Sequence, residues 1–374
     1  MLQESRSTLL HEKIKSHRRL TFDILDGMVD WVRVIDNNGI IIYANKSMEE
    51  ALGKDIVGTR CYSALGKSCA CKRCITETTI STGQIAEKEE IIGDRIFSVK
   101  SSPVRDLNDN IYAAVEVFRD VTRERKLEKE ILKRNEKMSK DLFFARTIQK
   151  KVLPQKGDFG PFRVDYSYKP SEMLSGDIFD IYRIDDNHTG IYISDVVGHG
   201  ITAAIMTMFI RQTIKAIKYE YLSPSKAISE LHKRFLDLNL DDDKYFTIFY
   251  GVFDNRDNSF RYTNGGHNCI PLHFRENKVE LLEAKGYPIT YLFNNIEYEE
   301  QCVILGKGDS ILFYTDGVIE ARNEEGEFFG LNRLVDIVKN SDEENLITEI
   351  ENNVDRFNQQ ELDDDFALLK IKVI

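Results

Sequence analysis

The sequence of 374 residues contains no run of eighteen apolar residues, so it predicts no membrane-spanning helix. Its first twenty residues include no continuous apolar stretch, and we therefore expect no signal peptide. Positive charge is also scarce, because 51 Lys and Arg face 62 Asp and Glu and give a net charge of −11. So acidic a chain is not expected to bind nucleic acid or an anionic membrane as its main partner. These absences predict a cytoplasmic protein without membrane or nucleic-acid partners.

Cysteine is sparse, with six in the chain, and without a secretion signal a disulfide framework is not expected. Cys269 and Cys302 are isolated, and we interpret them as buried or incidental. The other four lie within fourteen residues and are Cys61, Cys69, Cys71 and Cys74. Four thiols this close could hold zinc or an iron–sulfur cluster, could form a redox-sensitive disulfide, or could serve no cofactor. The single residue between the second and third is a cramped spacing for two ligands of one ion.

Residues 21–120 show the pattern of a small domain with an antiparallel sheet. Apolar runs rich in β-branched residues flank Asp36-Asn37-Asn38-Gly39, a turn sequence that predicts a β-hairpin. We expect further strand regions at Glu87–Ser101 and Ile111–Arg119. Short helices mixed with these strands predict an α+β domain.

Both ends of this segment resemble a Per-Arnt-Sim (PAS) sensor domain. The matching strings are VIDNNGIIIYANKSMEEALG and FSVKSSPVRDLNDNIYAAVEVFRDVTRERKLEKE. The resemblance implies a sensor domain whose last residues lead into a signalling helix. It identifies no ligand, and because residues 21–120 contain no histidine, haem held by a histidine is not expected there.

Residues 121–153 contain neither Gly nor Pro and are densely charged, which predicts one long helix ended by Pro154. Apolar residues recur along it at three- and four-residue steps, as in a two-stranded coiled coil. They are Val121, Leu127, Ile131, Met138, Leu142 and Ala145. Two interpretations remain open: a single solvated helix packed on one neighbour, or a helix that pairs with a second copy and makes the protein a homodimer. Residues 1–20 are expected to form a polar, partly helical lead-in.

Strands and helices alternate through residues 154–374, and their order predicts two sheets flanked by helices. Strand-like runs are FRVDYSYKP, HTGIYISDVV, YFTIFYGVFD, SFRYTNGG, CVILGKGDSILFYTDG and FALLKIKVI. Helix-like runs are ITAAIMTMFIRQTIKAIKYEY, SPSKAISELHKRFLDL, LNRLVDIVKN and ENLITEIENNVDRFNQQ. The whole chain is therefore expected to be a multi-domain α+β protein.

Four short acidic segments lie in this last part of the chain: SGDIFD, DVVGHG, YTDG and DDDFALL. Each sets an aspartate at a strand end or tight turn without an obvious local Lys or Arg. Carboxylates brought to one point repel each other unless cations neutralise them. Oxygen ligands select Mg²⁺ or Mn²⁺ over zinc, and two such ions can activate a water and neutralise a phosphoryl group. The segments therefore predict a dinuclear site that hydrolyses a phosphate ester.

In this order and spacing, the segments resemble the metal-dependent PPM-type phosphatases, and in particular the SpoIIE-like branch of bacterial regulatory serine phosphatases. The strings that carry the resemblance are ARTIQKKVLP, SGDIFD, SDVVGHGITAAIMT, YTNGGHN, YTDGVIEARNEEGEFFG and DDDFALLKI. It covers about residues 145–374 and implies a PPM-type α/β sandwich of two antiparallel sheets with helices outside. It also implies two Mn²⁺ or Mg²⁺ ions as cofactors.

The resemblance assigns the metal-binding and catalytic residues one by one. The ligands are Asp177, Asp195, Asp316 and Asp364, with the backbone carbonyl of Val196 as a further ligand. Secondary candidates are Asp365, Gly198 and His199. His199 could act as a general acid or could shape the turn before the helix, and His267 is interpreted as a loop-shaping residue.

The run Asp363-Asp364-Asp365 leaves the last ligand ambiguous by one position. Asp364 is chosen because residues 364–367 then align with the family's Asp-Asp-x-Thr. Ala367 stands where the family has threonine, a change that can alter a hydrogen bond but removes no ligand.

The resemblance implies a phosphatase for phosphoserine or phosphothreonine on a protein, such as a STAS-type anti-sigma-factor antagonist in a stress response. The residues alone support only a phosphomonoester on a protein. Two alternatives remain: a non-catalytic PPM-like scaffold, and a broader phosphatase or nucleotide phosphohydrolase with the same metals. A signal at the PAS domain (21–120) would act through the helix (121–153) on how well the last domain (154–374) holds its metals.

Overall fold

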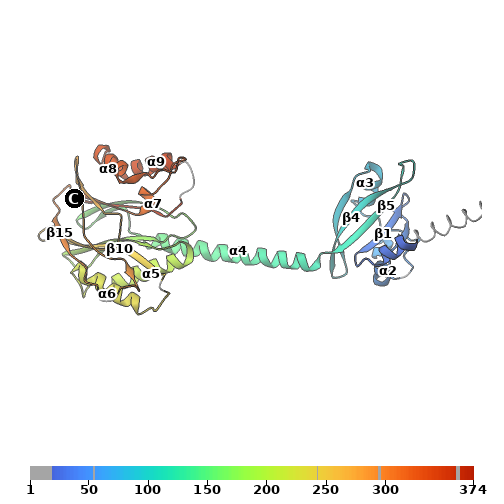
Figure 1. Ribbon diagram of the computed structural model, residues 1–374, viewed down its shortest axis with the longest axis horizontal. Helices are drawn as coiled ribbons and strands as arrows, with labels where there is room; N and C mark the ends of the chain where they lie inside the picture. Colours follow the sequence, from blue (N-terminus) through green and yellow to red (C-terminus); the bar gives the residue numbers. More distant parts are fainter. Residues whose placement is uncertain (1–18, 54, 242, 294–295, 359–362) are drawn as a thin grey trace, which may run out of the picture. The chain divides into compact units, whose positions relative to one another are not determined.

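The computed structural model describes residues 19–53, 55–241, 243–293, 296–358 and 363–374 (Figure 1). Contacts divide the chain into two units, residues 1–137 and 138–374. Most of the predicted lead-in lies outside the described residues. No helix in the described ranges combines the length and the apolar character needed to cross a membrane.

The first unit is built on one antiparallel sheet with strand order β2-β1-β5-β4-β3. Its strands are β1 (Trp31–Asp36), β2 (Ile41–Ala44), β3 (Ala86–Ile92), β4 (Arg95–Arg105) and β5 (Ile111–Asp120). Its short helices are α2 (Lys46–Leu52), α3 (Ile75–Thr82) and the 3₁₀ turn η1 (Ser63–Leu65). This confirms the predicted α+β domain with an antiparallel sheet and short helices. The predicted strand region Glu87–Ser101 is divided between β3 and β4, because Gly93 adopts a left-handed conformation (φ 61°) in the turn between them.

The predicted hairpin at Asp36–Gly39 joins β1 to β2. The Asp36 carboxylate accepts hydrogen bonds from the backbone N–H groups of Asn38 (2.9 Å) and Ile40 (2.8 Å). Gly39 takes a φ of 76°, which a residue with a side chain rarely adopts. The turn sequence therefore forms the predicted hairpin through its aspartate and its glycine.

Helix α4 (Thr122–Lys151) runs for 30 residues and ends before Pro154, close to the predicted bounds. Its apolar side chains stay in solvent along much of its length, with Leu127 49%, Ile131 57% and Met138 56% exposed. The helix therefore keeps the apolar stripe seen in the sequence largely uncovered by its own chain.

The second unit contains two six-stranded sheets. The first sheet has the order β15-β11-β10-β9-β8 with β14 paired to β10, and the second has the order β13-β12-β16-β17-β7-β6; the pairings are antiparallel. The first sheet comprises β8 (Asp177–Arg183), β9 (His188–Val196), β10 (Tyr245–Asp254), β11 (Ser259–Gly265), β14 (Ile289–Thr290) and β15 (Gln301–Ile304). The second comprises β6 (Gly157–Phe159), β7 (Phe162–Lys169), β12 (Leu272–Arg275), β13 (Lys278–Leu281), β16 (Ser310–Tyr314) and β17 (Phe366–Val373).

Helices cover the outer faces of both sheets, which gives four layers (Figure 1). Helices α5 (Gly200–Ile217) and α6 (Pro224–Leu236) pack on the first sheet, and α8 (Gly330–Asn340) and α9 (Leu346–Asn358) pack on the second. The inner core between the sheets is built from hydrophobic side chains that include Phe179, Ile193, Phe249, Phe313 and Leu369. The predicted sandwich of two antiparallel sheets flanked by helices is confirmed.

One strand-like run of the sequence crosses between the sheets. CVILGKGDSILFYTDG forms β15 in the first sheet and β16 in the second, with a turn between them. Gly308 has a φ of 91° in that turn, and the Asp309 carboxylate accepts a hydrogen bond from the backbone N–H of Gly306 (2.7 Å). The sequence pattern also did not predict β12, β13 or the short helix α7 (Asp316–Ile319).

Candidate functional site

Two of the predicted aspartates lie opposite each other on neighbouring strands. Side chains alternate along a strand, so Asp177 shares its face with Phe179, and Asp195 shares its face with Ile193. Both apolar residues belong to the core between the sheets. The register of β8 and β9 pairs Asp177 directly with Asp195. The first sheet thus ends in two carboxyl groups side by side, and two negative charges there would destabilise the sheet unless something neutralised them.

The second sheet reaches the same place through Thr315, which follows β16. Its hydroxyl donates a hydrogen bond to Asp177 Oδ2 (2.6 Å) and accepts one from the backbone N–H of Ala367 (3.1 Å). Asp316 follows as the first residue of α7. Thr315, directly after β16, therefore supplies a hydroxyl beside Ala367, which stands where the family has threonine.

Gly317 permits the close packing of this turn against the start of β17. A Cβ atom at Gly317 would lie 2.1 Å from the carbonyl oxygen of Asp365 and 3.3 Å from that of Asp364. No side chain fits there without moving the backbone. The glycine of YTDG is thus required to bring Asp316 against the last acidic segment.

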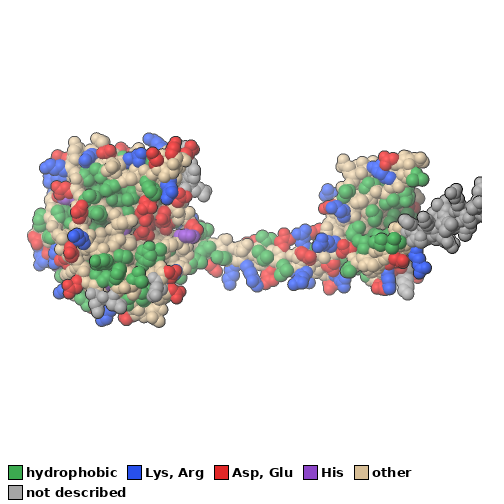
Figure 2. Space-filling model, viewed as in Figure 1, with side chains coloured by type: hydrophobic (Ala, Val, Ile, Leu, Met, Phe, Trp, Pro, Cys, Tyr) green, Lys and Arg blue, Asp and Glu red, His purple; other side chains and the backbone are tan. Residues whose placement is uncertain are grey.

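These segments enclose an open cavity of about 730 Å³. Its wall includes Asp195, Asp316 and Asp364, together with Val196 and residues of the turn before α5. Figure 2 shows acidic side chains gathered on the visible face of this unit. Asp177 lies behind the wall and is only 1% exposed. Three of the four predicted ligands therefore face one cavity, with the fourth buried next to them.

The charges of these carboxylates are not balanced by protein cations. Among the described residues, no Lys, Arg or His forms an ion pair with Asp177, Asp195, Asp316 or Asp364. Burial, reinforced by Asp316 and Asp364, raises the pKa of Asp195 to about 8. Burial and the charge of Asp364 raise the pKa of Asp316 to about 6, and burial and Asp195 raise that of Asp177 well above its usual value.

This donor set fits hard divalent cations, because it consists of carboxylate and carbonyl oxygens at the end of a cleft. Within the described ranges, no group of three or more His, Cys, Asp or Glu side chains is arranged to hold one ion. A site for Mg²⁺ or Mn²⁺ does not need such a group, because these ions keep several waters and take one or two carboxylates each. The residues are thus suited to ions that share the carboxylates and whose coordination shells are completed by water.

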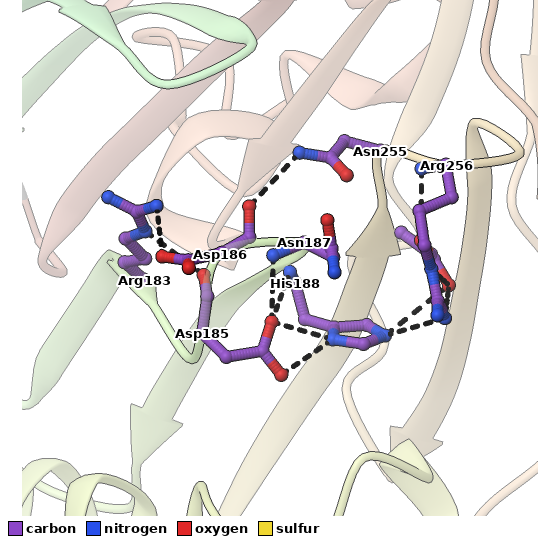
Figure 3. Close-up of polar contacts among 8 residues, drawn as sticks. Arg183, Asp185, Asp186, Asn187, His188, Asn255 and Arg256 are labelled. Atoms are coloured by element: carbon purple, nitrogen blue, oxygen red, sulfur yellow. Dashed lines mark hydrogen bonds and ion pairs between the residues drawn. The ribbon is translucent and has the colours of Figure 1, made fainter.

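A second acidic cluster, at the other end of β8 and β9, shows the opposite electrostatics (Figure 3). His188 Nδ1 lies 2.8 Å from Asp185 Oδ2, and His188 Nε2 lies 3.3 Å from Asp254 Oδ2. Hydrogen bonds from Arg256 hold the pKa of the Asp254 carboxyl well below its usual range. Arg256 gives Asp254 a cationic partner from the protein, and His188 contacts both carboxylates, so the cluster connects the ends of these strands without a metal ion.

The three consecutive aspartates at the start of β17 occupy different environments. Asp365 is buried, and its carboxylate accepts hydrogen bonds from the backbone N–H groups of Ser171 (2.8 Å) and Gly176 (2.6 Å) and from the Ser171 hydroxyl (3.0 Å). Asp363 and Asp364 line the cavity. Asp365 therefore ties the segment before β8 to β17, while Asp364 keeps its side chain at the cavity.

Single substitutions across this run are expected to separate the two roles. Asp364→Asn should lower metal-dependent hydrolysis at least roughly tenfold with little change in melting temperature, because it removes a ligand from the cavity wall. Asp365→Asn should lower the melting temperature, because a buried amide nitrogen would face the N–H donors of Ser171 and Gly176. Asp363→Asn should change both quantities least. Steady-state rates and thermal melts test the series, and a larger rate loss at Asp363 than at Asp364 would shift the ligand by one residue.

His199 lies at the rim of the cavity, in the turn before α5. Its Nδ1 is 2.9 Å from Glu172 Oε1, and both side chains are more than half exposed. Gly198 and Gly200 flank it with φ angles of 86° and 79°. The structure therefore places Gly198 and His199 beside the carboxylates, with His199 paired to a rim glutamate.

His267 has a larger structural role than that of a loop-shaping residue. Its Nδ1 lies 3.0 Å from Thr247 Oγ1, and its Nε2 lies 3.1 Å from the carbonyl oxygen of Tyr314. Burial lowers its pKa to about 4, so the ring is neutral. Thr247 pairs with Asp195 across the first sheet, and Tyr314 ends β16 just before Asp316's turn. His267 thus links the strand that pairs with the Asp195 strand to the strand that precedes Asp316.

Sequence reasoning missed Gln149, in the last turn of α4. The side chain is buried; its Nε2 donates to the carbonyl oxygen of Ser175 (2.7 Å), and its Oε1 accepts from the backbone N–H of Ser175 (3.1 Å). Nε2 also lies 3.4 Å from Thr207 Oγ1 on α5. The only available signal was an uncharged glutamine in the string ARTIQKKVLP, within a highly charged helix.

The four-layer sandwich with carboxylates at the end of the cleft between its sheets defines a protein of the PP2C-type fold, preceded here by a PAS domain. Residues 185–374 match the family described as Stage II sporulation protein E (SpoIIE), and residues 25–126 match the PAS fold. The chain belongs to the SpoIIE family. Asp195, Asp316 and Asp364 lie within the matched range, and Asp177 lies just ahead of it.

Solved structures agree with this fold. The SiaA-PP2C domain of Pseudomonas aeruginosa superposes with a TM-score of 0.56 at 19% identity, covering 64% of this chain and 98% of that one. A structure of the PP2C phosphatase domain with a fragment of the regulatory domain of SpoIIE from Bacillus subtilis gives a TM-score of 0.51 at 15% identity, covering 98% and 90%.

Two curated relatives come from Bacillus subtilis. Phosphoserine phosphatase RsbP is 32% identical over 184 residues, which are 48% of this chain and 45% of RsbP. Phosphoserine phosphatase RsbU is 28% identical over 206 residues, which are 54% of this chain and 61% of RsbU. The chain thus spans about half the length of the curated relatives it matches.

Proposed function

We propose that the second unit is a metal-dependent protein serine/threonine phosphatase that holds two Mn²⁺ or Mg²⁺ ions. The ligands are Asp177, Asp195, Asp316 and Asp364, with the carbonyl oxygen of Val196. One observation carries the proposal: carboxylates without protein cations converge on an open cavity. The relatives RsbP and RsbU, both described as phosphoserine phosphatases, support it.

The composition of the cavity wall favours phosphate bound through metal. No Lys or Arg is among the described residues that line it. A phosphoryl dianion entering this cavity would therefore meet carboxylate oxygens and no protein cation from Lys or Arg unless metal ions intervened. This argues for metal-assisted hydrolysis and against a mechanism based on an arginine clamp.

Bound metal ions supply a water of lowered pKa and neutralise the phosphoryl oxygens. The protein's part is to hold the ligands rigidly. Thr315 fixes one carboxylate oxygen of Asp177, and His267 links the strand beside Asp195 to the strand before Asp316. Gly176 leaves room for the turn, since a Cβ atom there would lie 2.9 Å from the carbonyl oxygen of Val196. Such preorganisation is what an electrostatically driven reaction requires.

The proposed substrate is a phosphorylated protein, with a STAS-type anti-sigma-factor antagonist of a stress response as the first candidate. The PAS domain would control the activity, and α4 would pair with its copy in a cytoplasmic homodimer. The exposed apolar side chains of α4 support the pairing, because a second helix would bury them.

Removal of metal tests the activity. With a phosphoserine protein as substrate, the full-length chain should release phosphate in Mn²⁺ or Mg²⁺, lose that activity in EDTA, and recover it when either ion is returned in excess. Unchanged hydrolysis in EDTA would contradict the metal mechanism. Binding of the phosphoprotein without turnover in any metal would identify a scaffold, and faster turnover of nucleotides than of phosphoproteins would identify a broader phosphohydrolase.

A further inference from the structure

The cysteine-rich segment of the PAS unit folds into a cationic environment. Cys71 Sγ lies 3.5 Å from Lys88 Nζ and 3.8 Å from Lys67 Nζ. Glu90 holds both ammonium groups in place, at 2.5 Å from Lys67 Nζ and 2.7 Å from Lys88 Nζ. Although burial opposes it, the contacts with Glu90 and Cys71 raise the pKa of Lys88, so its charge is retained. Two fixed positive charges beside a sulfur favour the thiolate form.

A second thiol of the segment occupies a helix N-terminus. Cys74 is the N-cap of α3, and its Sγ accepts the backbone N–H of Glu77 (3.5 Å). Backbone N–H groups and the dipole at this end of a helix stabilise negative charge. The two thiols belong to one C-x-x-C sequence, Cys71-Lys72-Arg73-Cys74.

Cys61 lies near this pair but is held differently. It is partly buried, and burial raises the pKa of its thiol despite the nearby Arg33. The charges of Cys74 and Cys71 both act on it, which places the three sulfurs in one neighbourhood. Its backbone carbonyl accepts a hydrogen bond from Arg33 Nη1 (2.7 Å), and Arg33 in turn pairs with buried Glu116. Cys61 is therefore anchored and partly buried, whereas the Cys71 sulfur lies beside two lysine ammonium groups and the Cys74 sulfur caps a helix.

These contacts favour thiol chemistry over a metal centre. A cation would have to approach Cys71 past two ammonium groups, and a positive environment weakens binding of a metal ion. For the part of the PAS unit that the structure describes, no set of three or more Cys, His, Asp or Glu side chains is arranged to hold a metal. The C-x-x-C sequence at a helix start is instead typical of redox-active dithiols.

We propose that Cys71 and Cys74 are a redox-active dithiol that is oxidised to an intramolecular disulfide by small disulfides. The Cys71 thiolate attacks one sulfur of the oxidant RSSR, whose S–S bond breaks as a mixed disulfide forms and RS⁻ leaves. The Cys74 thiolate then attacks the Cys71 sulfur and displaces the second RS⁻. The dithiol loses two electrons, the oxidant gains them, and the two thiol protons end on two RSH. This chemistry belongs to the PAS unit and does not depend on the proposed phosphatase activity.

Glutathione redox buffers applied to the full-length protein test the exchange. Oxidised glutathione should produce a Cys71–Cys74 disulfide, identified by peptide mass mapping after the free thiols are blocked. Cys74→Ser should stop the reaction at the first step and accumulate glutathione on Cys71, whereas Cys71→Ser should prevent both products. Glutathione found on Cys74 in the Cys71→Ser variant at the wild-type rate would reverse the assignment and overturn the proposed order of attack.

The lysines are tested by the rate of alkylation with iodoacetamide at pH 7. Cys71 should react at least roughly tenfold faster than the exposed Cys302 of β15, which serves as the internal reference. The double variant Lys67→Met, Lys88→Met should bring Cys71 to within about twofold of Cys302. Lys46→Met is the matched control, because Lys46 is an exposed lysine of the same unit.

Two results would overturn the proposal. One is an alkylation rate for Cys71 equal to that of Cys302 in the wild-type protein. The other is stoichiometric zinc or iron that protects all the clustered thiols and is released by a chelator, which would make the cluster a metal site. Circular dichroism and thermal melting of each variant establish that it is folded, so a misfolded variant is not mistaken for a negative result.

Discussion

The Asp195→Asn protein is expected to retain about one thousandth of the wild-type Mn²⁺-dependent phosphatase activity, a loss equivalent to about 4 kcal/mol of transition-state stabilisation. Asp195 pairs with Asp177 across β8 and β9, and its side chain lines the cavity together with Asp316. An amide in its place keeps the shape of the side chain but weakens the binding of any cation shared with the other carboxylates. Initial rates at saturating Mn²⁺ with a phosphoserine protein measure the loss.

Metal-free Asp195→Asn should nevertheless be more stable than the metal-free wild type. The folded-state pKa of Asp195 is raised to about 8 from an ordinary value of 3.8. Below about pH 4 the carboxyl is protonated in both states and adds no cost. As pH rises from about 4 to 8, the unfolded chain releases this proton before the folded one, so the stability of the folded state falls. Asparagine does not titrate, so the Asp195→Asn protein does not undergo this loss of stability.

Thermal melts in EDTA check the sign of this effect. The melting temperature of Asp195→Asn should exceed that of the wild type by a few degrees at pH 8, since about 1 kcal/mol shifts a domain of this size by ~2–4 °C. The difference should shrink towards pH 4. Asp186→Asn is the matched control, because Asp186 is exposed in the far hairpin of the same two strands (Figure 3). A destabilised Asp195→Asn at pH 8 would show that its carboxylate is compensated by the protein itself.

Local signals predicted much of the architecture. The hairpin at Asp36–Gly39 followed from a turn sequence whose carboxylate and glycine make the expected local contacts. The length of α4 followed from the absence of Gly and Pro before Pro154. The passage of the chain from the first sheet at β15 to the second sheet at β16 was not predictable in this way. A strand that ends one sheet and a strand that begins another have the same apolar pattern.

The candidate site, like the fold, was only partly predictable from the sequence. Acidic residues next to glycine are visible in a sequence, and the four ligands could be proposed from them. The difference between Asp364 and Asp365 could not be predicted, because the carboxylate of Asp365 is held by Ser171 and Gly176, almost two hundred residues earlier. The support from His267 was also hidden, since its two ring nitrogens contact strands of different sheets. A residue's type predicts its chemistry, while its partners depend on tertiary packing.

Gln149 is a buried residue of α4 that contacts the segment before Asp177. Its amide makes two hydrogen bonds to the backbone of Ser175, and the hydroxyl of Ser175 accepts the N–H of Asp177 (3.0 Å). The next residue, Gly176, donates its N–H to Asp365 and accepts the N–H of Val196 (3.1 Å). The end of the linker helix is therefore bonded to the short segment that positions Asp177 between the two sheets.

Gln149→Leu should lower activity at limiting Mn²⁺ by roughly 100-fold, because it leaves the buried N–H and carbonyl of Ser175 unpaired at about 1–3 kcal/mol each. Gln149 is a positioning residue, since it acts through Ser175 and touches neither metal nor substrate. The Mn²⁺ concentration for half-maximal rate should therefore rise, and much of the lost rate should return at saturating Mn²⁺. Lys150→Gln, an exposed change in the same helical turn, is the matched control.

The metal dependence distinguishes this coupling from simple destabilisation. A variant that only unfolds more readily would lose rate in proportion to its unfolded fraction, with an unchanged half-maximal Mn²⁺ concentration for the folded molecules. A Gln149→Leu protein with wild-type metal affinity would contradict the coupling, whatever its melting temperature. If the affinity falls as expected, any change in α4 that moves its last turn acts on Asp177 through Ser175. A signal in the helix then needs to shift only this one contact to change how tightly the metal is held.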